Sequence, residues 1–160
     1  MEDQTALLAE LNASWFASGL EPETAMRLAG LARSYSAEPG QELFREGDPS
    51  ELFGVVIRGR IALRTLVPER GPITILTIEP GDVFGWSTVV PPYRSTSSAT
   101  AIEPLEAIVF DAAGIRAAMR SDCQLALALY PRIMVAVSRR LNATRLQLLD
   151  LFAAEQVKTW

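Results

Sequence analysis

Between Ser34 and Asp111, short apolar runs alternate with turn-forming residues, and this alternation constrains the fold more than any other feature. The runs LFGVVI, RIALRTLV, ITILTI and LEAIVF are rich in β-branched residues and are bounded by Gly, Pro or Asp. This texture is typical of short antiparallel strands. About six to eight such strands predict a sandwich or a closed roll rather than a parallel sheet. Residues 67–72 (VPERGP) are expected to form an exposed hairpin tip.

Helical patterns flank this central region. Residues 4–33 carry apolar side chains at helical spacing, with a break at Ser18-Gly19. After Asp111 the pattern is helical to the end of the chain. The sequence therefore predicts one α+β domain over residues 1–160, an antiparallel, jelly-roll-like β-roll flanked by N-terminal helices and a long C-terminal dimerisation helix. Its expected parts are the N-terminal helices (1–33), the β-roll (34–111) and the C-terminal helices (112–160).

Pro131 interrupts the C-terminal helical pattern. Proline has no backbone N–H and its ring clashes with the preceding turn. We therefore expect one helix to end near Tyr130 and a second to begin at Pro131. The single cysteine, Cys123, is interpreted as a helix-packing residue rather than a nucleophile.

An unbroken heptad pattern runs along the last helix. A stripe through Ile133, Leu149 and Phe152 is expected to pack on the β-roll, which leaves the heptad seam free to pair with a second copy of the chain. The alternative is that the heptad seam itself covers the β-roll. The predicted dimer seam consists of Tyr130, Met134, Val137, Leu141, Thr144, Leu148 and Leu151.

The segment Gly81–Ala101, GDVFGWSTVVPPYRSTSSATA, is the most informative for function. A short helical turn after Gly85 would point free N–H groups at one spot, which suits an anion. Hydroxyl donors at residues 95–98 and the guanidinium of Arg94 would add to such a cradle. The alternative is a surface loop that is rich in turn formers for steric reasons.

This segment resembles the phosphate-binding cassette of cyclic-nucleotide-binding domains, the sensor modules of CRP/FNR regulators, cyclic-nucleotide-dependent kinases and gated channels. The resemblance extends to Gly40–Leu63, Ile73–Gly85, Leu20–Ala32 and RRLNATR (Arg139–Arg145). It implies the β-roll fold, with a ligand site in the cassette. The candidate ligand-binding residues are Phe84, Gly85, Trp86, Ser87, Thr88, Arg94, Ser95, Thr96, Ser97 and Thr144.

Two positions depart from the family's pattern. The family places a Glu after the cassette glycine to accept a hydrogen bond from the ribose 2′-hydroxyl, but Trp86 stands here, and indole has only a donor. Gap-free counting places Ser95 where the family's phosphate-binding Arg stands, with Arg94 one residue early. In an extended segment a shift of one residue turns the side chain to the opposite face. The alternative is that the loop backbone absorbs the shift and Arg94 takes the place of the family's Arg. Losing both contacts would weaken cyclic nucleotide binding by about two to four decades.

Thr144 aligns with the threonine with which the family's closing helix contacts the nucleotide base. In the family's transcription factors the same helix pairs two subunits. Thr144 therefore has two interpretations, a contact to the ligand or a polar position that sets the register of the helix pair.

Composition narrows the function classes. The chain carries a net charge of −4 and has no histidine, so neither a basic field for nucleic acid nor His-based catalysis or metal binding is expected. No metal site, enzymatic activity or membrane insertion is predicted, and a cytoplasmic location is expected because the N-terminal segment lacks a signal pattern. Sixteen residues after Thr144 leave no room for a helix-turn-helix domain, so no DNA binding is expected.

Two functions remain. The first is a stand-alone regulatory sensor domain with altered or lost cyclic nucleotide specificity, which binds a nucleotide-like or other small anionic ligand and acts through homodimerisation or a partner protein. Trp86 would then stack on the ligand. The second is a ligand-free dimeric scaffold or docking module in which Trp86 fills the vacant pocket. No cofactor is certain in either case.

Overall fold

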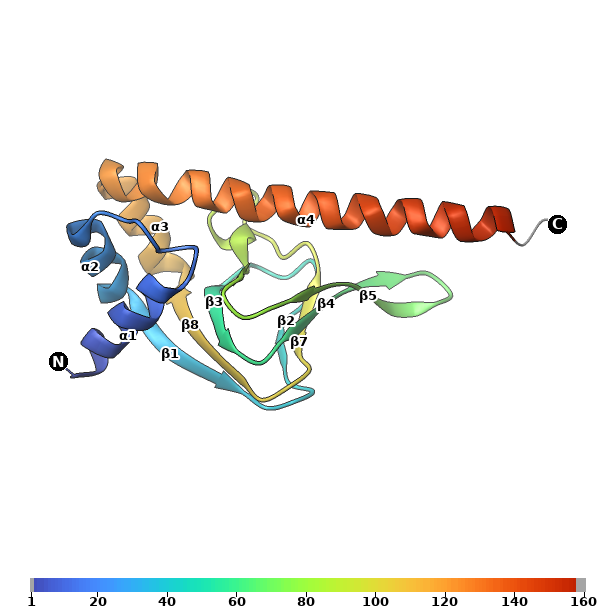
Figure 1. Cartoon of the computed structure of the whole chain (residues 1–160), viewed down its shortest axis with the longest axis horizontal. Coiled ribbons are helices and arrows are strands. Elements are labelled where there is room, and N and C mark those ends of the chain that lie inside the picture. The colour runs from blue at the N-terminus through green and yellow to red at the C-terminus, as the bar shows by residue number, and fades with distance from the viewer. Residues whose placement is uncertain (1, 158–160) are drawn as a thin grey trace.

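Two antiparallel β-sheets form a roll, with short helices at one end and a long helix along one side (Figure 1). The computed structural model describes the backbone of residues 2–157 and the side chains of residues 4–149. The helices are α1 (Glu2–Ala13), α2 (Pro22–Gly30), η1 (Trp86–Thr88), α3 (Ala112–Ser121) and α4 (Cys123–Val157). The strands are β1 (Ala32–Ala37), β2 (Glu42–Phe44), β3 (Leu52–Arg58), β4 (Ile61–Val67), β5 (Gly71–Ile78), β6 (Val83–Phe84), β7 (Ser98–Ala101) and β8 (Leu105–Asp111).

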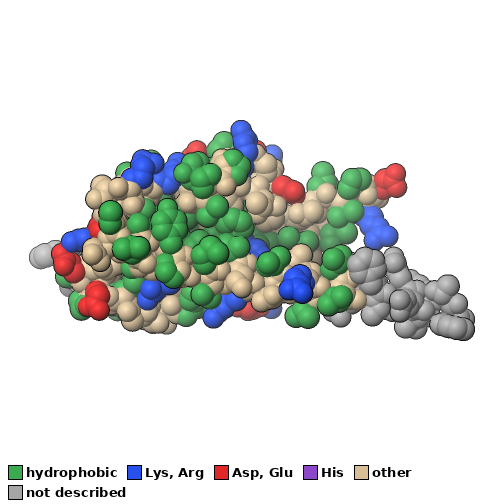
Figure 2. Space-filling view, turned by 90° about the horizontal axis from the view of Figure 1, so that it is seen from above, with side chains coloured by type: hydrophobic (Ala, Val, Ile, Leu, Met, Phe, Trp, Pro, Cys, Tyr) green, Lys and Arg blue, Asp and Glu red, His purple; other side chains and the backbone are tan. Residues whose placement is uncertain are grey.

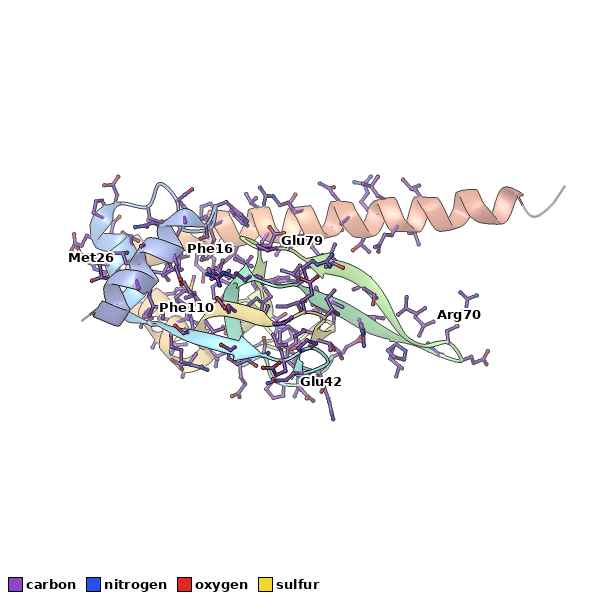
Figure 3. The ribbon with its side chains drawn as sticks, turned by 60° about the horizontal axis from the view of Figure 1, so that its bottom comes forward. Phe16, Met26, Glu42, Arg70, Glu79 and Phe110 are labelled. Atoms are coloured by element: carbon purple, nitrogen blue, oxygen red, sulfur yellow. The ribbon has the colours of Figure 1, made fainter. Side chains whose placement is uncertain are left out.

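The strands pair in the orders β1-β8-β3-β6 and β2-β7-β4-β5, which confirms the predicted antiparallel roll with flanking helices. Residues 68–70 join β4 to β5 at the expected hairpin tip. This hairpin projects beyond the rest of the roll on the same side as the free end of α4 (Figure 1). Arg70 lies at its tip (Figure 3).

Two apolar cores hold the roll together. One lies between the sheets and includes Val56, Leu63 and Phe84, all fully buried. The other joins the helices to the first sheet through a chain of aromatic rings. The ring centroids of Phe16 and Phe53 are 5.5 Å apart, and those of Phe53 and Phe110 are 5.7 Å apart. Figure 3 shows Phe16 and Phe110 between the N-terminal helices and the roll, whereas Met26 lies on the outside.

α4 is continuous through Pro131, so the predicted break at Tyr130 is wrong. Burial on both sides of the proline explains the continuity. Leu125 and Leu129 before it and Ile133 after it are buried in one stripe against the core, and breaking the helix would expose part of that stripe. The Arg132 guanidinium donates to the Ala128 carbonyl at 3.0 Å and to the Ser18 carbonyl at 2.9 Å, which ties this part of α4 to the segment after α1.

Two further expectations for α4 need correction. Leu149 is exposed rather than packed on the roll. The C-terminal part of α4 extends beyond the main body of the roll (Figure 1). Cys123 is exposed rather than packed, because it is the first residue of α4 and precedes the buried stripe. Of the expected inner stripe, Ile133 is buried, and Phe152 lies outside the residues whose side chains are described.

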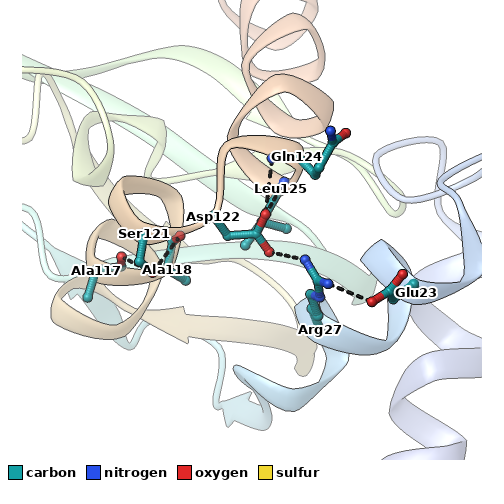
Figure 4. Close-up of polar contacts among 8 residues, drawn as sticks. All are labelled: Glu23, Arg27, Ala117, Ala118, Ser121, Asp122, Gln124 and Leu125. Carbon is teal, nitrogen blue, oxygen red and sulfur yellow. Dashed lines mark hydrogen bonds and ion pairs between the residues drawn. The ribbon is translucent and has the colours of Figure 1, made fainter.

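An ion-pair cluster fixes the start of α4 against α2 (Figure 4). Asp122 accepts hydrogen bonds from the backbone N–H groups of Gln124 and Leu125 at 3.0 and 3.1 Å, as an N-terminal cap does. The Arg27 guanidinium bridges Asp122 and Glu23. The Leu125 N–H, and after it Arg27, holds the pKa of Asp122 below its ordinary value. The long helix is thus anchored at its N-terminal end.

Within the helices that the structure describes, none has the length and hydropathy to cross a membrane.

Among the glycines of the described residues, Gly85 leaves the least space for a Cβ atom. Its φ is +69°, and a Cβ atom there would lie 1.8 Å from the Leu52 carbonyl oxygen of β3. Gly81 has a similar φ of +89°, but a Cβ atom there would meet nothing within 4 Å. The two glycines therefore share a positive φ and differ in the space around them.

Gly85→Ala should be much more destabilising than Gly81→Ala. The left-handed conformation alone costs alanine about 1–2 kcal/mol, and a forced backbone shift adds about 1–3 kcal/mol. We therefore expect Gly81→Ala to lower the free energy of unfolding by about 1–2 kcal/mol and Gly85→Ala by about 2–5 kcal/mol. Urea titrations of both variants measure this, and equal losses would contradict the close approach.

Candidate functional site

The cassette begins at Gly85, where β6 ends and the single turn of η1 starts. The N–H groups of Thr88 and Val89 are turned back to the carbonyls of Gly85 and Trp86 at 3.0 and 3.1 Å. Gly85 is the N-cap of this turn, and its left-handed conformation lets the backbone pass close to β3. The start of the cassette's first turn is therefore fixed by the close packing of Gly85 on β3, without a capping side chain.

Thr88 connects the cassette to the rest of the domain. It is fully buried, and its Oγ1 lies 2.9 Å from the Ser50 Oγ. Its backbone carbonyl accepts a hydrogen bond of 3.0 Å from Arg116 of α3, whose guanidinium also lies 5.0 Å from the Tyr93 ring centroid. Ser87 beside it is buried as well. The predicted residues Ser87 and Thr88 thus lie inside the cassette, and Thr88 supports its shape.

Residues 94–97 alternate between solvent and interior. Arg94 and Thr96 are exposed, whereas Ser95 and Ser97 are each only 4% exposed. The Arg94 guanidinium donates to the Gly47 carbonyl at 2.7 Å. Arg94 is therefore engaged on the outside and does not share the inner face with the serines. The Ser95 Oγ is buried and has no hydrogen-bond partner.

The side chains of Trp86, in the cassette, and Arg140, on α4, lie close together. The guanidinium carbon of Arg140 lies 5.9 Å from the centroid of the Trp86 ring. The Trp86 Nε1 and the Arg140 Nε are both buried without a hydrogen-bond partner. Burial lowers the pKa of Arg140 to about 10, and the charge of Asp82 only partly offsets it.

Among the described side chains, the buried polar atoms without a partner are the Trp86 Nε1, the Ser95 Oγ and the Arg140 Nε. All three belong to the cassette or to the part of α4 that faces it. Indole and guanidinium nitrogens can only donate, and a hydroxyl can donate. The site can therefore offer hydrogen bonds to an acceptor, whereas it lacks the carboxylate that would receive one from a ribose hydroxyl.

Thr144 is exposed, and its Oγ1 donates to the Arg140 carbonyl at 2.9 Å on its own helix. Sequence reasoning did not single out Arg140, although it lies in the RRLNATR stretch. The reason is that its importance depends on Trp86, which is far away along the chain. Whether the candidate residues hold a ligand stays a prediction.

The comparisons with known proteins agree with this geometry. The model of the cyclic nucleotide-binding domain family matches residues 35–122, more than half of the chain. The chain belongs to this family. The recognition made from the sequence is therefore confirmed.

Two curated relatives show how the domain occurs elsewhere. The chain is 36% identical over 97 residues to the acetyltransferase Pat of Mycolicibacterium smegmatis, covering 61% of this chain and 29% of that protein. It is 30% identical over 134 residues to the CRP-like cAMP-activated global transcriptional regulator of Mycobacterium tuberculosis, covering 83% of this chain and 58% of that protein. The chain thus spans less than two thirds of the length of either relative.

A solved structure described as a putative cyclic nucleotide-binding protein of Geobacter metallireducens has the same fold. Its TM-score is 0.74 at 24% sequence identity, and the match covers 83% of this chain and 96% of that one.

Arg140→Met should stabilise the protein. The folded-state pKa of Arg140 lies below the ordinary arginine value, so the penalty for its charge is fully present below about pH 10 and declines only as the pH rises above that value. Removing a partly desolvated, unpaired charge should raise the free energy of unfolding at pH 7 by about 1–2 kcal/mol, after the loss of the cation–π contact.

The matched control is Arg145→Met, on an exposed position of the same helix. It should change the free energy of unfolding by less than about 0.5 kcal/mol. Thermal unfolding of both variants at pH 7 provides the measurement, and a destabilised Arg140→Met protein would show that the guanidinium has a compensating partner.

Proposed function

We propose that this chain is a regulatory sensor domain whose modified cassette has lost ordinary cyclic nucleotide specificity, and that it acts through a homodimer or a partner protein. The observation that carries the proposal is the set of unpaired donors at Trp86, Ser95 and Arg140. Buried polar groups usually have partners, so an unpaired group in a native structure calls for an explanation. A ligand that supplies acceptors would be one.

Membership in the family supports a nucleotide-like ligand, and the M. tuberculosis relative is described as cAMP-activated. The donor set of this cassette opposes ordinary cAMP recognition, because Trp86 cannot accept from the ribose hydroxyl. No DNA-binding or enzymatic role is proposed for residues 1–160, which carry a net charge of −4.

The second candidate is a ligand-free dimeric scaffold. The indole of Trp86 is partly buried and packs against the core that joins the helices to the first sheet, as a side chain that fills a vacant pocket would. The two candidates differ in whether the inner face of the cassette accepts a ligand once its charged groups are restored.

The exposed face of α4 supports dimerisation in both cases. Figure 2 looks onto this helix and shows hydrophobic side chains gathered along it. Of the predicted seam, Leu141 and Leu148 are 59% and 54% exposed, and Tyr130 and Met134 are also exposed. Val137 is partly buried, and the side chain of Leu151 lies outside those that are described. An apolar band of this kind is unusual on a monomer.

The dimer should depend on this seam. Leu141→Asp and Leu148→Asp each place a carboxylate in the proposed interface, and burying it unpaired costs about 3 kcal/mol or more, which weakens the dimer by about a hundredfold or more. Light scattering at tens of micromolar should show a dimer for the parent and a monomer for each variant. Asn142→Asp adds the same charge at an exposed position outside the seam and should leave the dimer intact. A parent protein that is monomeric would refute the dimer.

Cyclic nucleotide binding should be weak but recoverable. Trp86→Glu supplies the ribose acceptor and a partner for Arg140, and Ser95→Arg supplies a cation on the buried face. Together they should strengthen cAMP binding by about 3–5 kcal/mol, more than the sum of the single changes, because both groups hold one ligand in one pose. Calorimetric titration with cAMP and cGMP measures the gain.

The control keeps the charge and moves it to the outer face. Trp86→Glu combined with Thr96→Arg should increase cAMP affinity much less, because the side chain of Thr96 is exposed. Trp86→Glu combined with Ser97→Arg tests the other buried serine position of the segment. Micromolar binding by the parent would contradict the loss of specificity. Folded inward-facing variants that stay silent at millimolar nucleotide would favour the scaffold.

A further inference from the structure

A pocket of about 190 Å³ lies between α4 and the end of β5, and Trp15, Asp82 and Val83 complete its lining. Its lining residues, all within the described part of the chain, include none of residues 84–97. The pocket nevertheless adjoins the site above, because it shares Arg140 with that site and Asp82 and Val83 with the segment Gly81–Ala101. Its apolar walls are formed by Leu76, Ile78, Val83, Ala136 and Ala143. A pocket with apolar walls and a few placed polar groups is the usual form of a small-molecule site.

At one edge of the pocket, Trp15, Asp82 and Arg139 form a cluster without net charge whose members contact one another. Asp82 Oδ1 accepts a hydrogen bond of 3.1 Å from the Trp15 indole and lies 3.6 Å from the Arg139 guanidinium. The Arg139 guanidinium also lies 4.5 Å from the Trp15 ring centroid. Asp82 and Arg139 therefore compensate each other, and neither needs an external partner.

Arg140 is the remaining charge in the lining. Within the described residues its guanidinium makes no hydrogen bond and no ion pair, and its Nε is buried. The only opposing charge in the lining, Asp82, is already shared with Arg139. The pocket thus combines apolar walls with one uncompensated positive charge.

We propose that this pocket binds a small monocarboxylate with an apolar body, whose carboxylate pairs with the guanidinium of Arg140. A planar carboxylate matches the planar guanidinium in two parallel hydrogen bonds. One negative charge neutralises the pocket, whereas a dianion would leave an excess. The apolar body replaces water against the pocket walls.

Such a ligand would also act on the cassette. The guanidinium that it engages is the one that lies 5.9 Å from the Trp86 ring. Occupation of the pocket and the position of Trp86 are therefore coupled through one side chain.

Benzoate, benzamide and inorganic phosphate test the site as probes. Benzamide has the shape of benzoate without its charge, and phosphate has charge without an apolar body. Nuclear magnetic resonance reports binding through the indole N–H signal of Trp15, which lines the pocket and is identified by its loss in Trp15→Phe. We expect benzoate to shift this signal with a dissociation constant about ten- to a hundredfold below that of benzamide or phosphate.

The variants separate the anchor from general effects. Arg140→Met should weaken benzoate binding by about tenfold or more and leave benzamide binding unchanged. Arg140→Lys keeps a point charge without the planar pair and should fall between the parent and Arg140→Met. Arg145→Met, at an exposed position, should bind benzoate as the parent does. Each variant is first shown to be folded by its thermal transition.

Several results would overturn the inference. The inference would be wrong if benzoate and benzamide bound equally well, or if benzoate still bound tightly to the Arg140→Met variant. It would also be wrong if phosphate bound as tightly as benzoate, or if about 10 mM benzoate did not shift the Trp15 signal. Titration of the parent protein with cAMP reports on the cassette. Benzoate binding beside a silent cassette would therefore support this pocket while leaving the proposed nucleotide site unsupported.

Discussion

The approach of the cassette backbone to β3 is the contact on which the site depends. At Gly85 no side chain fits beside the Leu52 carbonyl, so the chain can turn directly from β6 into η1. The segment that leads into β6 is hydrogen-bonded to the same strand. The Val56 N–H donates to the Asp82 carbonyl at 3.0 Å, and the Gly81 N–H donates to the Val56 carbonyl at 2.7 Å. Since β3 lies inside its sheet, between β8 and β6, the start of the cassette is attached to a strand that is paired on both sides.

A second constraint is the division of α4 into two faces. Leu125, Leu129 and Ile133 bury one face against the core, and the start of the helix is capped by Asp122. The opposite face keeps large apolar side chains in solvent. Packing against the roll therefore sets the direction of the helix and, with it, the direction in which the exposed face points.

The sequence predicted what depends on local patterns. Turn residues between β-branched runs located the strands, and the alternation of an extended segment correctly placed Arg94 and Ser95 on opposite faces. It failed where distant packing overrides a local rule, as at Pro131, whose helix continues because buried residues lie on both sides of it. The sequence analysis missed Arg140 for the same reason, since the residue beside it in the fold is Trp86, about fifty positions earlier in the chain, which offers no acceptor for its guanidinium.

Arg140 and Leu141 are consecutive residues on one rigid helix, yet one faces the roll and the other faces solvent. A rotation of α4 that moves the guanidinium relative to Trp86 must also move the exposed seam. If that seam joins two copies, ligand occupancy and subunit association share one coupling free energy, which acts equally in both directions. The apparent affinity of any ligand held by Arg140 would then vary with protein concentration, so the fraction of the domain that is occupied would depend on the concentrations of both the domain and its ligand.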